Sequence, residues 1–149
     1  MTNNEALIGL RYLMNITDAR LVEIAALGET VITLDEIRSF LMNDQEAGYT
    51  PLSHEVMAGF LNGLIVYKRG RDPASPLPPL DVPVTNNVVL KKMRVAFELK
   101  DVDIIEIIAK SGLRVSKSEL SAFFRKRDHR NYRECGDQFL RNLFKGMSL

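Results

Sequence analysis

The chain repeats itself, and this internal duplication limits the fold more than any other feature of the sequence. Residues 2–64 align with residues 85–147 at one constant offset of 83 positions, without a gap. Thirteen of the 63 aligned pairs are identical: Thr2/Thr85, Asn3/Asn86, Asn4/Asn87, Leu7/Leu90, Arg11/Arg94, Asp18/Asp101, Glu23/Glu106, Ile24/Ile107, Ala26/Ala109, Glu36/Glu119, Phe40/Phe123, Tyr49/Tyr132 and Gly63/Gly146. Many other pairs stay apolar. Chance does not preserve a gapless apolar pattern, so the sequence predicts two copies of one folding unit.

A proline-rich segment, residues 69–84, separates the two copies and holds five of the six prolines. Proline lacks an N–H group and has a fixed φ, so this segment can be neither helix nor inner strand. We therefore expect an extended linker between a first repeat, residues 1–68, and a second repeat, residues 85–149. A unit of about 65 residues buries only a small core. We expect the two repeats to pack on each other through their first and last helices, or the chain to dimerise.

Within each repeat, apolar residues recur at spacings of three and four, which is the period of an α-helix. The first repeat predicts helices over residues 3–15, from Asp18, after Thr33 and over residues 53–67, and the second repeat predicts their equivalents. No segment shows the alternation of a strand. The predicted fold class is all-α: two tandem, homologous four-helix repeats joined by a proline-rich linker.

Several helix starts can be predicted from capping residues. Asp18 and Asp101 are expected to be the N-caps of the second helices, and one of the paired asparagines caps the first. The segments Thr33–Glu36 and Ser116–Glu119 fit the capping box, in which a hydroxyl and a carboxylate each accept from the other residue's backbone N–H. These boxes predict where the third helices begin.

The two repeats differ in charge although their apolar patterns agree. Residues 1–68 hold 4 Lys/Arg and 9 Asp/Glu, giving −5, whereas residues 85–149 hold 14 and 8, giving +6. The overall charge of +1 is therefore a cancellation between an acidic and a basic repeat.

The basic charge is concentrated in residues 125–133, after the expected third helix of the second repeat. The candidate binding residues are Lys117, Arg125, Lys126, Arg127, Arg130, Tyr132 and Arg133. Cations bind phosphates by releasing counterions, and tyrosine can stack on an unpaired base. Three interpretations stay open: a nucleic-acid or acidic-protein site, an electrostatic contact with the acidic first repeat of the same or another chain, and a solvated loop.

Two arginines recur beside the apolar stripe of the first helix of each repeat. A partly buried guanidinium needs a carboxylate partner. We expect Arg11 to pair with Glu23 and Arg94 with Glu106 as structural ion pairs, with the aspartates that open the second helices as the next candidates. A site for a ligand carboxylate or phosphate is the alternative.

The sequence offers little for catalysis, metal or cofactor binding. Its only metal-binding nitrogen and sulfur side chains are His54, His129 and Cys135, too few for a zinc site. It lacks a glycine-rich phosphate loop and a serine nucleophile elbow. We expect Cys135 to be a small, semi-buried structural residue. We expect no enzyme activity, no metal and no cofactor.

Further sequence features bear on the cellular location of the protein and on whether it reads DNA. The sequence has no apolar run long enough to cross a membrane and no signal peptide, so we expect a cytoplasmic protein that does not insert into membranes. Residues 106–120 suggest a helix-turn-helix. The turn is about two residues longer than usual, so this hairpin is expected to serve packing, with DNA reading as the alternative.

Three segments resemble the YehS-type family of bacterial proteins, which carry a domain of unknown function in two tandem copies. They are Leu61–Gly70 (LNGLIVYKRG), Leu120–Lys126 (LSAFFRK) and Asn131–Asp137 (NYRECGD). The resemblance covers essentially the whole chain and implies a bacterial protein with tandem domains. It implies no activity, ligand or catalytic residue.

These observations favour a non-catalytic binding protein that contacts nucleic acid, or another acidic partner, through its basic second repeat. The alternative is a self-association module, in which the basic repeat pairs with the acidic repeat and the protein forms homo-oligomers.

Overall fold

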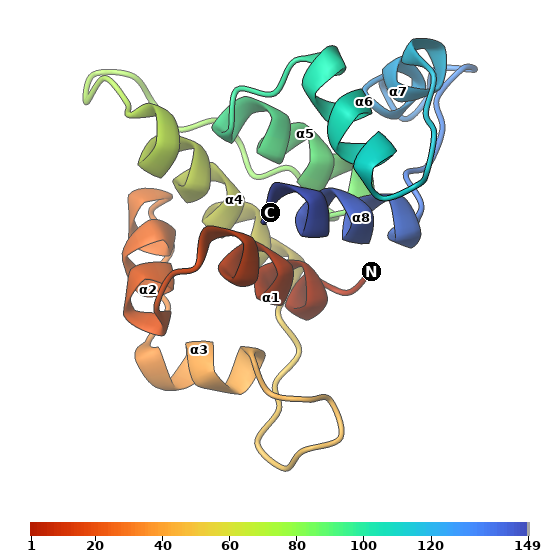
Figure 1. Cartoon of the computed structure of the whole chain (residues 1–149). Coiled ribbons are helices and arrows are strands. Elements are labelled where there is room, and N and C mark those ends of the chain that lie inside the picture. Colours follow the sequence, from red (N-terminus) through yellow and green to blue (C-terminus); the bar gives the residue numbers. More distant parts are fainter. Residues whose placement is uncertain (149) are drawn as a thin grey trace.

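The computed structural model describes residues 1–148, which form helices joined by loops and contain no strand (Figure 1). The helices are α1 (Asn3–Met14), α2 (Asp18–Leu27), α3 (Leu34–Phe40), α4 (His54–Arg69), α5 (Asn86–Ala96), α6 (Asp101–Lys110), α7 (Lys117–Phe123) and α8 (Asp137–Met147). Helices α1–α4 belong to the first repeat and α5–α8 to the second. The predicted all-α fold of two tandem four-helix repeats is confirmed.

Hydroxyl side chains start most of the helices. The capping boxes predicted at Thr33 and Ser116 are both present. A further box joins Thr2 to Glu5, so Thr2 and not an asparagine caps α1. The prediction of an asparagine cap is therefore wrong by one or two positions.

The second helices also begin one residue away from the expected place. Asp18 and Asp101 are the first residues of α2 and α6, and the caps are Thr17 and Lys100. The Thr17 hydroxyl accepts from the N–H of Arg20 at 3.2 Å, as a cap requires. An aspartate in the first turn instead meets the positive end of the helix dipole and remains free to pair with a cation.

Glycines bring the second and fourth helices of each repeat close together. A methyl group at Gly63 would collide with the carbonyl oxygen of Ile24, and one at the equivalent Gly146 would collide with the side chain of Ile107. The two contacts are related by the 83-residue offset, which explains why this glycine occurs in both copies. The sequence alignment showed the identity but not its cause.

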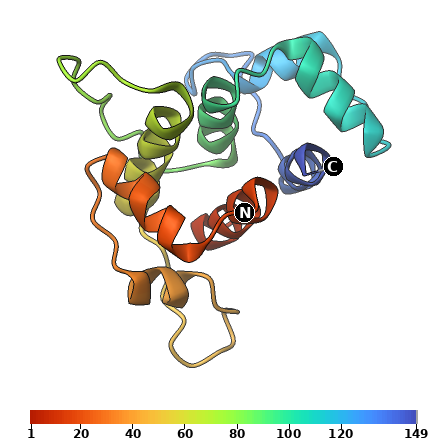
Figure 2. The same cartoon turned by 60° about the vertical axis from the view of Figure 1, so that its left-hand side comes forward.

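The two repeats pack on each other through their first and last helices, as predicted. Helix α4 lies against α5, and α1 lies against α8 (Figures 1 and 2). Because α1 corresponds to α5 and α4 to α8, both contacts join a first helix to a fourth helix. The interface is therefore an approximate two-fold arrangement, like that of an isologous dimer. Buried apolar residues of both repeats form one continuous core.

A buried polar bridge spans the α4–α5 half of this interface. The Lys92 ammonium donates to Asn62 Oδ1 at 3.0 Å, and Asn62 Nδ2 donates to the carbonyl oxygen of Pro78 in the linker at 3.1 Å. Lys92 is only 7% exposed. Its pKa lies below the usual value because burial disfavours the charged form and the neighbouring Lys91 adds repulsion. The linker is thus tied to both repeats.

Candidate functional site

The loop between α7 and α8 carries the basic cluster, and an asparagine at the start of α5 holds that loop in place. Asn87 Nδ2 donates to the carbonyl oxygens of Phe123 at 3.0 Å and Arg133 at 2.7 Å. Its Oδ1 accepts from the N–H of Cys135 at 2.9 Å. One buried side chain therefore fixes both ends of the loop.

The first repeat contains the same clasp. Asn4 Nδ2 donates to Phe40 at 3.0 Å and Thr50 at 2.9 Å, and its Oδ1 accepts from the N–H of Leu52 at 2.9 Å. All three partners lie 83 positions before those of Asn87. Sequence reasoning treated this asparagine as a helix cap and missed the clasp. The sequence signal that could have revealed the clasp was the presence of this asparagine in both repeats.

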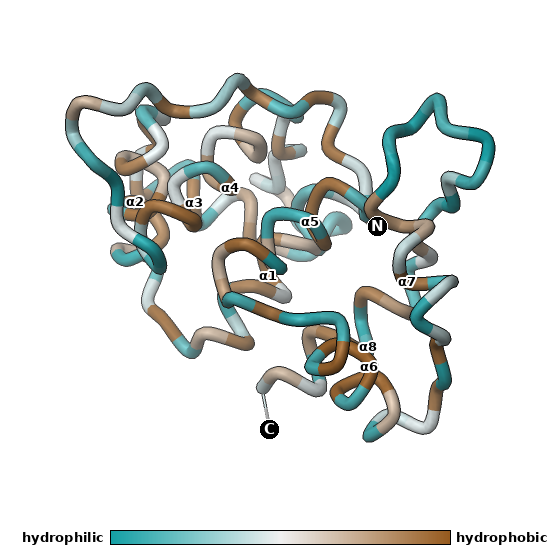
Figure 3. The backbone as a smooth tube through the Cα atoms, turned by 90° about the horizontal axis from the view of Figure 1, so that it is seen from above, coloured by the Kyte–Doolittle hydropathy of each residue, from teal (hydrophilic) through white to brown (hydrophobic). Residues whose placement is uncertain are grey.

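The two loops also share their turns. The N–H of Tyr132 donates to the carbonyl oxygen of His129 at 2.9 Å, and the N–H of Tyr49 donates to that of Glu46 at 3.3 Å. The chain thus builds one loop geometry twice, from two unlike sequences. Figure 3 shows the loop after α7 as a nearly continuous hydrophilic stretch.

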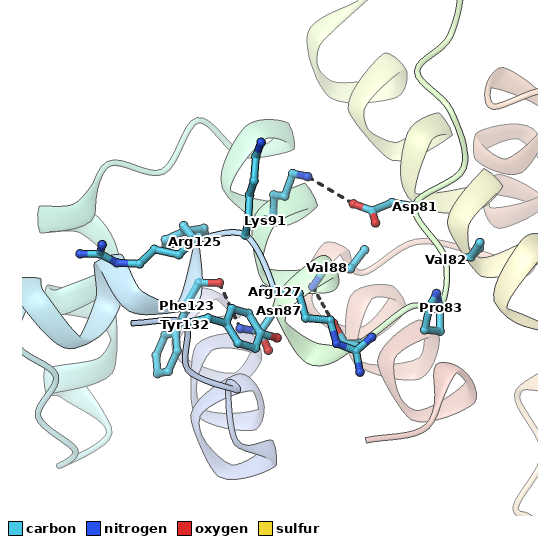
Figure 4. Close-up of a pocket in the computed structure, with 13 residues that line it drawn as sticks. Asp81, Val82, Pro83, Asn87, Val88, Lys91, Phe123, Arg125, Arg127 and Tyr132 are labelled. Atoms are coloured by element: carbon cyan, nitrogen blue, oxygen red, sulfur yellow. Dashed lines mark hydrogen bonds and ion pairs between the residues drawn. The ribbon is translucent and has the colours of Figure 1, made fainter. Parts of the chain in front are cut away.

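In the second repeat a hollow of about 240 Å³ lies between α5, the linker and this loop, and we call it the basic pocket (Figure 4). Its lining residues are Asp81, Val82, Pro83, Thr85, Asn87, Val88, Lys91, Phe123, Phe124, Arg125, Lys126, Arg127 and Tyr132. Three of the predicted basic residues meet here, together with Tyr132. Lys91, which the sequence did not single out, joins them from α5 and pairs with Asp81 at 3.2 Å.

The first repeat has an equivalent hollow, the acidic pocket, with the opposite charge. Its lining residues are Thr2, Asn4, Glu5, Ile8, Met42, Asn43, Asp44 and Tyr49, and each lies 83 positions before a residue of the basic pocket. Its charged groups are Glu5 and Asp44, which correspond to Val88 and Arg127. The scaffold is thus the same, while the charges around the shared tyrosine are reversed.

The remaining predicted residues lie around this pocket. Arg130 and Arg133 line a second hollow that also includes Arg125 and Tyr132. Lys117 begins α7 and lines neither of these two hollows. The structure therefore brings together all the candidate residues except Lys117.

The six predicted cations, Lys117 at the start of α7 and five in the loop, have no ionic partner within residues 1–148. The side chains concerned are exposed and are Lys117, Arg125, Lys126, Arg127, Arg130 and Arg133. The two loops also lie on opposite sides of the molecule (Figures 1 and 2). Within the chain, these cations therefore form no ion pair with the acidic first repeat, and the contact with the first repeat of another chain stays a prediction.

Tyr132 is the partly buried centre of the cluster. Burial and the nearby Glu134 carboxylate raise the pKa of its phenol above the usual value. The hydroxyl therefore stays protonated at neutral pH and can donate a hydrogen bond.

The predicted arginine pairs have different partners from those expected. Arg11 Nε lies 2.8 Å from Asp18 Oδ1, and Arg94 Nη2 lies 3.2 Å from Asp101 Oδ1. Glu23 instead pairs with Arg20 at 2.8 Å. The predictions of Glu23 and of Glu106 as partners are wrong.

Helix geometry explains this correction. A short loop joins the first and second helices, so an arginine at the end of one meets the first residue of the next. Residues 23 and 106 lie more than a turn further along. Arg94 also stands over the ring of Phe124, 4.5 Å from its centroid, and so packs against the base of the basic loop.

The groups considered for catalysis and metal binding behave as structural residues. Cys135 is buried, and desolvation raises the pKa of its thiol to about 12, far too high for a nucleophilic thiolate at neutral pH. Across the described residues no three His, Cys, Asp or Glu side chains gather in a group that could hold a metal ion.

None of the helices within residues 1–148 is both long and apolar enough to span a membrane. Residues 111–116 separate α6 from α7, a longer connection than a helix-turn-helix uses.

The fold and the site define an all-α tandem-repeat protein. Each repeat carries a pocket at equivalent positions, acidic in the first repeat and basic in the second. The model of the family described as "Protein of unknown function (DUF1456)" matches residues 3–70 and 86–149, one match for each repeat. The chain is also 41% identical to "Uncharacterized protein YehS" of Escherichia coli (strain K12), over 99% of this chain and 95% of that protein. No solved structure matches the chain significantly. The chain therefore belongs to this family, and the resemblance seen in the sequence is confirmed.

Proposed function

We propose that the protein is a non-catalytic nucleic-acid-binding protein whose second repeat contacts phosphates through the basic loop. One observation carries this proposal: the same pocket recurs in both repeats, but only the second surrounds its tyrosine with unpaired cations. Three of these, Arg125, Lys126 and Arg127, line the basic pocket beside Lys91, which pairs with Asp81.

The fold itself does not require these cations. The first repeat forms the same clasp and the same turns with Asp44 and Glu46 in the loop. Five positive charges within residues 125–133 repel one another and find no carboxylate partner in the described chain. Phosphates of a nucleic acid would supply the missing negative charge and release their counterions.

Binding can be tested by fluorescence anisotropy with labelled RNA and DNA across a salt series. The test variant is the triple replacement Arg125→Gln, Lys126→Gln and Arg127→Gln. We expect it to weaken binding at least about tenfold and to make the slope of log K against log salt shallower by about 2 to 3.

The control variant removes the same number of charges from the same repeat, away from the pocket. It replaces Lys100, Lys110 and Arg114, which are exposed and line neither hollow of the loop, by glutamine. Equal weakening by both variants would show a non-specific response to net charge and would contradict the proposal.

The alternative is self-association, in which the basic pocket of one chain meets the acidic pocket of another. The opposite charges of the two pockets and their placement on opposite sides of the chain favour this candidate. Light scattering across the same salt series separates the two functions. Mass that falls with added salt, without nucleic-acid binding, supports self-association; constant mass with salt-sensitive binding supports the proposed function.

A further inference from the structure

We infer that the ligand of the basic pocket is a single-stranded nucleic acid, with one base held against Tyr132 and its backbone crossing the loop. This inference rests on the proposed function and specifies its substrate class. The geometry around Tyr132 points to a single strand because the tyrosine lies between two hollows that are both lined by cations.

The basic pocket suits one flat group. Its volume of about 240 Å³ lies below the range of about 300–1,000 Å³ for pockets that enclose drug-sized molecules. Three aromatic side chains, Phe123, Phe124 and Tyr132, contribute to its lining beside the cations. An unpaired base can stack on such a side chain whatever its identity, since every base has a π-face.

Cations are placed on both sides of the tyrosine. Lys126 and Arg127 line the basic pocket, Arg130 and Arg133 line the second hollow, and Arg125 lines both. Glu119, which also lines the second hollow, accepts a hydrogen bond from the N–H of Ser116. Phosphates before and after a base at Tyr132 would therefore each find positive groups. The only carboxylate in the lining of the basic pocket, Asp81, is paired with Lys91 at 3.2 Å.

A neighbouring carboxylate pair restricts the path of the strand. A third hollow beside Tyr132 includes Arg127 and Met1, whose amino group pairs with Asp137, but also Glu134, so its charges cancel. The second hollow instead holds three arginines against one carboxylate, Glu119. The hydrogen bonds from the amino group of Met1 and from Asn86 lower the pKa of Asp137, so it stays charged. The backbone is therefore expected to pass from the basic pocket to the second hollow and to avoid the third.

A duplex fits this surface less well. Its bases are stacked and paired, so none is free to enter the pocket, and duplex reading commonly inserts a helix or ribbon into the major groove. The cations here lie on a loop, and the preceding helix α7 spans only Lys117–Phe123.

The loop is rigid enough to present the tyrosine in one position. Asn87 holds Phe123 and Cys135 at its two ends, and the N–H of Arg133, next to the tyrosine, donates to the carbonyl oxygen of Ala122 at 3.2 Å. A prepared stacking platform loses little conformational freedom when a base binds.

The absence of tryptophan from the chain allows a direct experiment. Tyr132→Trp introduces a single fluorescent reporter in the basic pocket, and Tyr49→Trp places a matched control in the acidic pocket. The probes are a thymidine oligomer of about 15 nucleotides and a duplex of the same length.

The expected result has three parts. The oligomer quenches the indole of the Tyr132→Trp protein but not that of the Tyr49→Trp protein, and binds at least about tenfold more tightly than the duplex. Tyr132→Ala weakens binding of the oligomer about tenfold or more, whereas Tyr49→Ala and Tyr132→Phe leave it within about twofold. Circular dichroism of each variant checks that it is folded.

The outcomes separate the inference from the proposed function. Equal binding of oligomer and duplex, with an unquenched Tyr132→Trp and a Tyr132→Ala no weaker than Tyr49→Ala, would overturn the inference and leave phosphate binding intact. No binding of either probe by the wild-type protein would overturn both.

Discussion

The two repeats of this chain are built alike and charged oppositely. Each has a threonine cap followed by an asparagine clasp, and the clasp makes the same three hydrogen bonds to equivalent backbone atoms. The loop that the clasp holds is acidic in the first repeat and basic in the second. This contrast separates what the fold demands, which both repeats share, from what the surface was free to change.

The repeats also differ in how tightly their helices approach. In the first repeat Gly28, Gly59 and Gly63 all lie where an added methyl group would collide with α4, α2 or the residues after α2. In the second repeat only Gly146 remains, and Ser111 and Asn142 stand at the other two positions. The first repeat is therefore the more closely packed of the two.

The largest expected effect comes from removing the clasp. Asn4→Ala and Asn87→Ala each leave two carbonyl oxygens and one N–H without their partner, so each should lower the free energy of unfolding by about 3 kcal/mol. Urea denaturation measures this loss. Only Asn87→Ala should also weaken nucleic-acid binding, because it releases the basic loop; a matching loss of binding in Asn4→Ala would show that the two loops do not differ in function.

Glycine replacement should affect the first repeat more strongly. Gly63→Ala places a methyl group against the backbone of Ile24, which cannot move aside, and should destabilise by about 3 kcal/mol. Gly146→Ala meets the Cγ2 methyl group of Ile107, a side-chain atom and not a backbone atom, and should lower stability by less, about 2 kcal/mol. Thermal unfolding of both variants provides the comparison, and equal losses would contradict the difference in packing.

The buried Lys92 predicts a pH dependence at the interface of the repeats. Its folded pKa is below 10.5, the unfolded value, so between these two values the unfolded chain binds more protons and stability rises with pH. Lys92→Met abolishes this contribution. The stability of the wild type relative to Lys92→Met should therefore increase as pH approaches 10.5 from neutral. A constant difference over that range would mean that the ammonium is not desolvated.

The arginine pairs should give the smallest effects. Arg11→Ala breaks a partly exposed ion pair and should cost less than about 1 kcal/mol. Arg94→Ala should cost about 0.5–1 kcal/mol more, because Arg94 also lies over Phe124. Equal losses in denaturant titrations would show that the aromatic contact contributes nothing.

Much of the fold could be predicted from the sequence because its determinants are local or repeated. Each of these signals lies within a few consecutive residues of the sequence: the helix period, the capping boxes at Thr33 and Ser116, and the linker prolines. The duplication adds a long-range fact, since two units that are each too small must share a core. The predicted packing through first and last helices followed from this.

The errors arose where side chains reach beyond their own helix. Asn87 bonds residues 36 to 48 positions away, and no local pattern distinguishes such a clasp from a helix cap. Lys91 joins the basic pocket from another element, and Arg11 finds Asp18 because of a turn geometry that helical spacing does not give. The bridge of Lys92 and Asn62 depends on how the repeats pack, which neither repeat encodes alone.

The central claim is that the basic loop, placed on a scaffold shared by both repeats, binds nucleic acid. Because the repeats align without a gap, residues 125–131 can be replaced by the sequence of residues 42–48 without altering loop length. The measurement is the salt dependence of oligonucleotide binding by the wild type and by this loop-exchanged chain, each with its unfolding free energy. We predict similar stability for both, a slope of log K against log salt of about −3.5 to −4.5 for the wild type, and binding by the exchanged chain too weak to measure. The same affinity and slope in both chains would contradict the claim.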